Sequence, residues 1–89
     1  MNKKRRIEIS NNLHELVRIK DRIEFIKENF DSILFDEQDS YDNIPENLQN
    51  SDRAMDSEEA IEYIGEAISY IGDAIDNIDN AIDSIEEIS

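Results

Sequence analysis

Isoleucine recurs every seven residues at two sets of positions in the second half of the chain, and this spacing constrains the fold more than any other feature. The two sets alternate at intervals of three and four residues, as the a and d positions of a heptad repeat do, and such positions share one side of an α-helix. We therefore expect one long helix over about residues 51–87. Its seam comprises Ile61, Ile64, Ile68, Ile71, Ile75, Ile78, Ile82 and Ile85.

Alanine precedes each isoleucine of the a set, at Ala60, Ala67, Ala74 and Ala81. The apolar stripe thus covers three positions per heptad, which suits a helix bundle better than a two-stranded seam. Gly65 and Gly72 stand at position e, although glycine inside a helix costs about 1 kcal/mol relative to alanine. They either make room for bulky groups, such as Phe25, Ile26 or the helix of a second copy, or mark a site where a partner's backbone approaches.

A looser heptad pattern runs through the first half and predicts a helix over about residues 4–40. The connection, residues 41–50, contains the only proline, Pro45, which disfavours helical geometry at the residue before it. Ser51 is the expected N-cap of the second helix. Residues 1–89 would then form a single helical-hairpin domain. The first helix carries two rows spaced by seven, which are Ile9, Leu16, Ile23 and Phe30, and Ile19, Ile26 and Ile33.

Charge is distributed unevenly, and its distribution favours an antiparallel arrangement. Residues 1–30 hold eight Lys or Arg and five Asp or Glu, a net +3, whereas residues 31–89 hold one Arg against 18 carboxylates, a net −17. Folding back with the turn near residue 45 would set Glu86 and Glu87 beside the basic residues 3–6, and Asp73 beside Arg18. The predicted fold class is all-α, a coiled-coil-like antiparallel two-helix hairpin.

Two helices leave part of such wide apolar stripes exposed. We therefore expect self-association, most simply a homodimer in which two hairpins form a four-helix bundle.

Few side chains that carry chemistry are present. Cysteine is absent, which excludes disulfides and thiolate sites, and His14 is the only histidine. The sequence contains neither the Glu-x-x-His motif of di-metal bundles nor a calcium-binding loop. Carboxylates on a solvated helix face lack the concave pocket that general acid and base catalysis needs. We expect a protein that is not an enzyme, with no catalytic residue, metal or cofactor.

The net charge of −14 determines which partners the surface attracts. It would repel nucleic acid and anionic membranes over most of the surface and attract basic proteins. No apolar run approaches the ~20 residues of a membrane span. We therefore expect a cytoplasmic protein with no direct nucleic-acid binding and no membrane contact.

The carboxylates of the second helix lie away from its isoleucine seam. They serve solubility, or they bind a basic partner by imitating a nucleic-acid backbone, since carboxylates four residues apart rise about 6 Å along a helix, comparable with phosphate spacing. Tyr63 and Tyr70 beside these rows would either add contact area or shield the seam. The candidate partner-binding acidic face comprises Glu62, Glu66, Asp73, Asp76, Asp79 and Asp83.

The segment from Tyr41 to Ile88, which begins "YDNIPENLQNSDR", resembles small acidic helical-hairpin proteins of phages and mobile elements of Gram-positive bacteria. In these, an "IPENLQ" turn followed by Ser-acidic-Arg leads into repeated acidic-Ala-Ile or Ala-Leu heptads. The resemblance transfers no catalytic residue, and implies an inhibitor of host defence or host nucleic-acid enzymes.

Three functions are consistent with these features. The first is a non-enzymatic acidic protein-protein interaction module that acts by binding another protein. The second is a nucleic-acid-mimicking inhibitor of a basic host protein. The third is a structural or assembly component whose working surface is the isoleucine seam.

Overall fold

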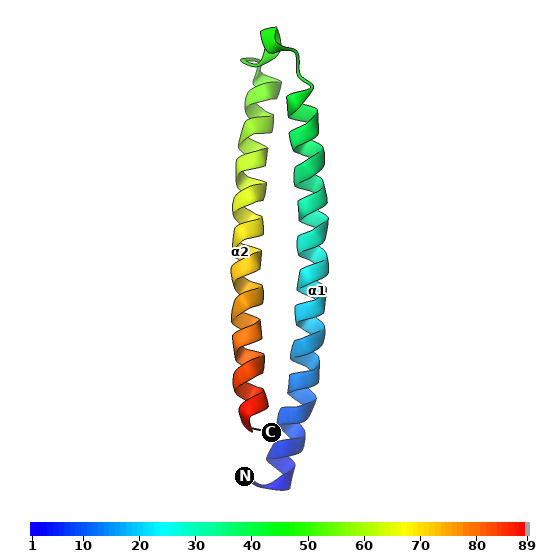
Figure 1. Ribbon diagram of the computed structural model, residues 1–89, viewed down its shortest axis with the longest axis vertical. Helices are drawn as coiled ribbons and strands as arrows, with labels where there is room; N and C mark the ends of the chain where they lie inside the picture. Colours follow the sequence, from blue (N-terminus) through cyan, green and yellow to red (C-terminus); the bar gives the residue numbers. More distant parts are fainter. Residues whose placement is uncertain (89) are drawn as a thin grey trace.

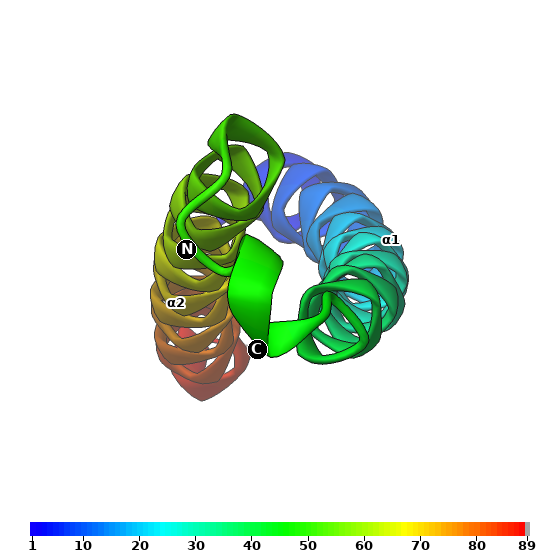
Figure 2. The ribbon, with the colours of Figure 1, turned by 90° about the horizontal axis from the view of Figure 1, so that it is seen from above.

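The structure, a computed structural model, describes residues 1–88 as two long helices that lie side by side and run in opposite directions (Figures 1 and 2). Helix α1 spans Lys3–Asp42 and helix α2 spans Asp52–Ile88, and the connection contains the short 3-10 helix η1, Glu46–Leu48. The rod measures 70 × 15 × 14 Å. The predicted all-α antiparallel hairpin is confirmed.

Side-chain caps define where each helix begins. The Asn2 side chain accepts a hydrogen bond from the Arg5 backbone N–H at 2.8 Å, and the Ser51 hydroxyl accepts one from the Ala54 N–H at 3.2 Å. Each satisfies a donor that the first helical turn leaves without a partner. Gln49 donates from its side chain to the Ile44 carbonyl at 2.9 Å and closes the connection on itself. Ser51 therefore caps α2 as predicted.

The isoleucine seam of α2 packs against α1 along the length of the hairpin. Ile75 and Ile82 are buried, at 9% and 7% exposure, and the other six isoleucines of the seam are half-buried. Towards the connection, the buried residues Ala54 and Ser57 continue the same two heptad positions. The helix presents its a and d positions to α1, as the heptad pattern predicts.

The side of α1 that faces α2 contains more polar residues than its two apolar rows suggest. The row from Ile9 to Phe30 lies at position d of the interface, but the row Ile19, Ile26 and Ile33 lies at position g, where these side chains are 48%, 37% and 48% exposed. Two packed helices share only two heptad positions fully, so a third position stays at the edge. Position a holds Leu13, Lys20, Lys27, Leu34 and Tyr41, all half-buried.

The register of the two helices differs from the predicted one. Asp79, rather than Asp73, lies against α1, and its partner is Lys20. Arg18 instead pairs with Glu15 of its own helix at 3.6 Å. The reason is that α1 continues to Asp42, which moves the centre of the turn later in the chain. Figure 1 shows the first turns of α1 extending past the end of α2.

Candidate functional site

Five of the six predicted acidic residues lie together on the surface of α2 that points away from α1. They stand at heptad positions b and f, which are about 40° apart around a helix, and all five are exposed. Within residues 1–88, no Lys or Arg lies within ion-pair distance of these carboxylates. This surface, the acidic outer face, consists of Glu62, Glu66, Asp73, Asp76 and Asp83.

Asp79, the sixth predicted residue, belongs to the contact between the helices. Its Oδ1 lies 2.5 Å from Lys20 Nζ, which also lies 3.6 Å from Glu24 Oε1. The hydrogen bond to Asp79 is the main reason why the pKa of Lys20 is raised above its ordinary value. The Lys20 side chain is 24% exposed, so its aliphatic stem packs in the interface while its ammonium reaches the edge.

Lys27 occupies the next a position towards the connection and packs in the same way. Its Cε lies 3.6 Å from the point where a Cβ on Gly72 would stand, and its Nζ lies 3.7 Å from Asp31 Oδ2. The side chain nearest to Gly72 is thus the stem of Lys27, rather than Phe25 or Ile26, and a Cβ would fit beside it at ordinary contact distance. At Gly65, no neighbouring atom lies within 4 Å of the Cβ position.

A polar cluster links the helices at the turn end. Buried Ser57 donates its hydroxyl to the Glu37 carboxylate at 2.6 Å, and Tyr41 donates its hydroxyl to the Glu58 carboxylate. The second hydrogen bond is the main reason why the pKa of Tyr41 is raised. No buried side-chain polar atom of residues 1–88 lacks a hydrogen-bond partner. The cluster therefore fixes the register and leaves no buried group free for chemistry.

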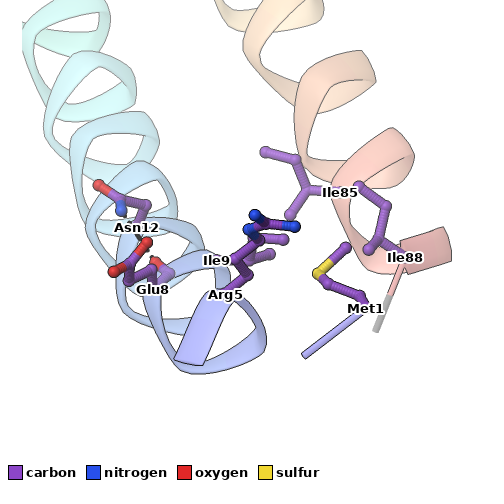
Figure 3. A pocket seen from close by; sticks show the side chains of 7 residues that line it. All are labelled: Met1, Arg5, Glu8, Ile9, Asn12, Ile85 and Ile88. Carbon is purple, nitrogen blue, oxygen red and sulfur yellow. Dashed lines mark hydrogen bonds between the residues drawn. The ribbon is translucent and has the colours of Figure 1, made fainter. Parts of the chain in front are cut away.

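A shallow groove of about 370 Å³ opens between the helices at the other end of the rod (Figure 3). Figure 3 shows Ile9, Ile85 and Met1 gathered between the two helices, with Glu8 and Asn12 on the outer turn of α1. The groove is mainly apolar and holds no convergent set of polar side chains. Its lining residues are Met1, Arg5, Glu8, Ile9, Asn12, Ile85 and Ile88.

A second hollow lies at the start of α2 and extends the acidic surface. Its volume is about 510 Å³, and it is lined by Asp52, Met55, Asp56, Glu58, Glu59 and Glu62. Despite this density of carboxylates, no group of three or more potential ligands in residues 1–88 could hold a metal ion. In the same part of the chain, neither helix combines the length and apolar character that crossing a membrane requires.

Sequence reasoning missed the polar residues of the interface. Position a of α1 holds Lys20, Lys27 and Tyr41, position d of α1 holds Glu37, and position d of α2 holds Ser57. The polar residues of α1 could have been found from their alternating intervals of three and four residues. A lysine can stand at position a because its long apolar stem packs between the helices. The eight isoleucines of α2, in turn, are already engaged by α1 and hold the hairpin together.

Comparison of the chain with protein-family models, curated proteins and solved structures found no match. The resemblance to phage and mobile-element proteins therefore stays a prediction.

Proposed function

We propose that the protein is a non-enzymatic interaction module that binds a basic protein through the acidic outer face of α2. The observation that carries this proposal is the concentration of five exposed carboxylates at neighbouring positions b and f, without a cation beside them. Like charges three or four residues apart destabilise a helix by a few tenths of a kcal/mol per pair. Solubility alone is served equally well by mixed charges.

Binding would follow from long-range attraction between this face and a positively charged surface. Such attraction raises the association rate and weakens steeply with ionic strength. Asp79 would contribute little, because its carboxylate is already paired with Lys20. The proposal includes a cytoplasmic location, and the resemblance of residues 41–88 adds a phage or mobile-element origin.

A second candidate function, imitation of a nucleic-acid backbone, is favoured by the continuity of the acidic outer face. From Glu62 to Asp83 the carboxylates follow one side of a single unbroken helix. That distance is about 30 Å at 1.5 Å per residue. A basic groove that accommodates a nucleic-acid strand would meet five carboxylates over this length, about half the number of phosphates that one strand presents there. The partner would then be a nucleic-acid-binding protein of the host.

Charge neutralisation tests the proposal. In the test variant, the five residues of the acidic outer face become Gln or Asn. In the control, Asp21, Glu28, Asp39, Asp42 and Glu46 are changed in the same way, so both variants move from −14 to −9. Immobilised wild-type protein should retain a basic protein from bacterial lysate at low salt and release it at high salt. The control should behave likewise, and the test variant should retain much less.

Equal retention by both variants would refute the proposal, because it would show that net charge alone attracts the protein. Competition separates the two candidate functions. If added DNA or RNA displaces the retained protein, the acidic face occupies a nucleic-acid site. If it does not, a basic surface of another kind is bound.

A further inference from the structure

One long side of α2 carries no charge over most of its length. The ten Asp and Glu residues between 57 and 88 all stand at heptad positions b, e and f. Positions a, d, g and c form one continuous arc of the helix surface, and within it α1 covers a and d most fully. Positions g and c hold Ala60, Tyr63, Ala67, Tyr70, Ala74, Asn77, Ala81 and Ser84, and all of these are exposed except the half-buried Ala60 and Ala67.

The exposed isoleucines of α1 lie on the same side of the hairpin, as both ends of the rod show. At the open end, Arg5 and Asn12 from position g of α1 line a groove together with Ile88 from position g of α2. At the turn end, Ser40 and Ala60, again from the two g positions, line another hollow. The g rows therefore share one flank throughout. We call it the lateral apolar face, formed by Ile19, Ile26, Ile33, Ala60, Tyr63, Ala67, Tyr70 and Ala74.

The opposite flank is polar, and the contrast shows which side is suited to further packing. There Lys20 meets Glu24 and Asp79, and Lys27 meets Asp31. On the lateral apolar face, Tyr63 and Tyr70 are 61% and 66% exposed, beside isoleucines that are 37% to 48% exposed. Aromatic side chains and the absence of charge are typical of the centre of protein interfaces.

A single hairpin also exposes more surface than a chain of its size normally does. Its accessible surface is 6843 Å², whereas a compact folded chain of 10.4 kDa exposes about 5,400 Å². A standard interface removes about 800 Å² from each partner. Docking of a second rod along the lateral apolar face would bring the exposed surface of each chain closer to the usual value.

We propose that the lateral apolar face binds a second copy of this chain, with the two hairpins antiparallel in a four-helix bundle. The net charge of the chain determines which of its surfaces a second copy can approach. Each copy carries −14, so two copies can approach only where neither presents rows of carboxylates. The lateral apolar face meets this condition, whereas a basic partner would be drawn to the acidic outer face on another side of α2.

The antiparallel orientation follows from the charges at the ends of the rod. If the two copies ran parallel, the basic residues Lys3, Lys4, Arg5 and Arg6 of both would lie together. In the antiparallel dimer, a two-fold axis near Ile26 brings this basic end beside the connection of the other copy, which is flanked by Asp42, Glu46 and Asp52. The isoleucine rows of the two α1 helices then meet at the two-fold axis, and the alanine rows of the two α2 helices face each other, where small side chains allow close approach.

Mass measurements on three proteins test the interface. Sedimentation equilibrium at micromolar concentration should give wild type twice the mass of one 10.4 kDa chain. The double variant Ile26→Glu and Ala67→Glu should give the mass of one chain while remaining helical by circular dichroism. Phe35→Glu, which changes a side chain that is 72% exposed on another side of α1, should remain dimeric. A monomeric, helical wild type would overturn the proposal, as would a double variant that stays dimeric.

Single cysteines test the geometry, because the natural chain has none and any disulfide must therefore come from the introduced residue. Ile26→Cys lies at the proposed two-fold axis and should form a disulfide-linked dimer under mild oxidation. Ala81→Cys should not, because its two copies would be at least about 24 Å apart along the rod at 1.5 Å per residue. Efficient linkage through Ala81→Cys would overturn the antiparallel arrangement, and absence of linkage through Ile26→Cys would overturn the interface.

The dimer and the proposed binding of a basic protein involve different sides of α2. The cysteine and mass experiments need no other protein, and the retention experiment leaves the lateral apolar face unchanged. Failure of either proposal is thus recognised independently of the other.

Discussion

Lys20 reaches across the hairpin to Asp79 from a position inside the helix interface, while the neighbouring Ile19 stays 48% exposed. A lysine thus lies between the helices, and an isoleucine lies at their edge. The pattern repeats one heptad later with Lys27 and Ile26. A hairpin acting alone has little reason for this arrangement. The arrangement is explained if a second chain covers the edge that carries the isoleucines, while the edge that carries the lysine ammonium groups faces water.

Replacing both interface lysines by leucine should stabilise the protein. Ion pairs at partly buried positions are often no better than well-packed apolar side chains. We expect Lys20→Leu with Lys27→Leu to raise the free energy of unfolding, measured by urea denaturation at one fixed protein concentration. As a companion variant, Asp79→Asn removes only the ion pair and should cost at most about 1 kcal/mol, because Asp79 is 46% exposed. A leucine variant less stable than wild type would contradict this view of the interface.

The buried isoleucines of α2 should matter far more than equally large side chains at the surface. Ile82 is 7% exposed, and its replacement by alanine removes buried methyl groups and leaves a cavity. We expect Ile82→Ala to lower the free energy of unfolding by about 2–4 kcal/mol. Ile7→Ala is the matched control, because Ile7 is 51% exposed, and its effect should be within about 0.5 kcal/mol. Similar losses in both variants would show that the seam is placed wrongly.

The fold could be predicted because α2 repeats a nearly perfect heptad, and because Pro45 and Ser51 mark where one helix must stop and the next begin. The face of α1 was harder to predict. Its apolar residues fill three positions per heptad, and a sequence pattern does not say which two of three meet the partner helix. The choice depends on where lysine stems pack and where their ammonium groups find carboxylates, which is a property of both helices together.

All five residues of the acidic outer face could be predicted from helical spacing alone. Asp79 could not be separated from them, since its role depends on the register, and the register depends on where α1 ends. With α1 ending at Asp42, the turn is centred later in the chain than expected, and Lys20 rather than Arg18 pairs with a carboxylate of α2.

The two glycines of α2 offer a direct test of what the helix leaves room for. A Cβ at Gly72 would make an ordinary contact with Lys27 at 3.6 Å, and a Cβ at Gly65 would meet no neighbour within 4 Å. Both Gly65→Ala and Gly72→Ala should therefore raise the free energy of unfolding, by about 0.5–1 kcal/mol each, measured by thermal or urea denaturation. If Gly65→Ala stabilises the chain but weakens capture of the basic protein, a partner's backbone approaches at Gly65. If both properties improve or stay constant, the glycine serves no contact.

Alkaline pH should weaken the hairpin through two groups that hold their protons more tightly in the folded state. Hydrogen bonds to Glu58 and Asp79 raise the pKa of Tyr41 above its ordinary 10.0 and that of Lys20 above 10.5. Their contribution to stability is therefore complete below about pH 10 and is lost as the pH rises through the folded-state pKa values.

The free energy of unfolding should accordingly fall above pH 10, and Tyr41→Phe or Lys20→Met should each flatten this decline. Lys4→Met, at an exposed position near the start of α1, is the control and should keep the wild-type profile. Urea denaturation at intervals between pH 8 and pH 11.5, followed by circular dichroism, measures the effect. The difference in absorbance at 295 nm between wild type and Tyr41→Phe follows the Tyr41 hydroxyl itself. A Tyr41 that ionises at or below its ordinary pKa would show that its hydrogen bond to Glu58 does not hold the turn end together in solution.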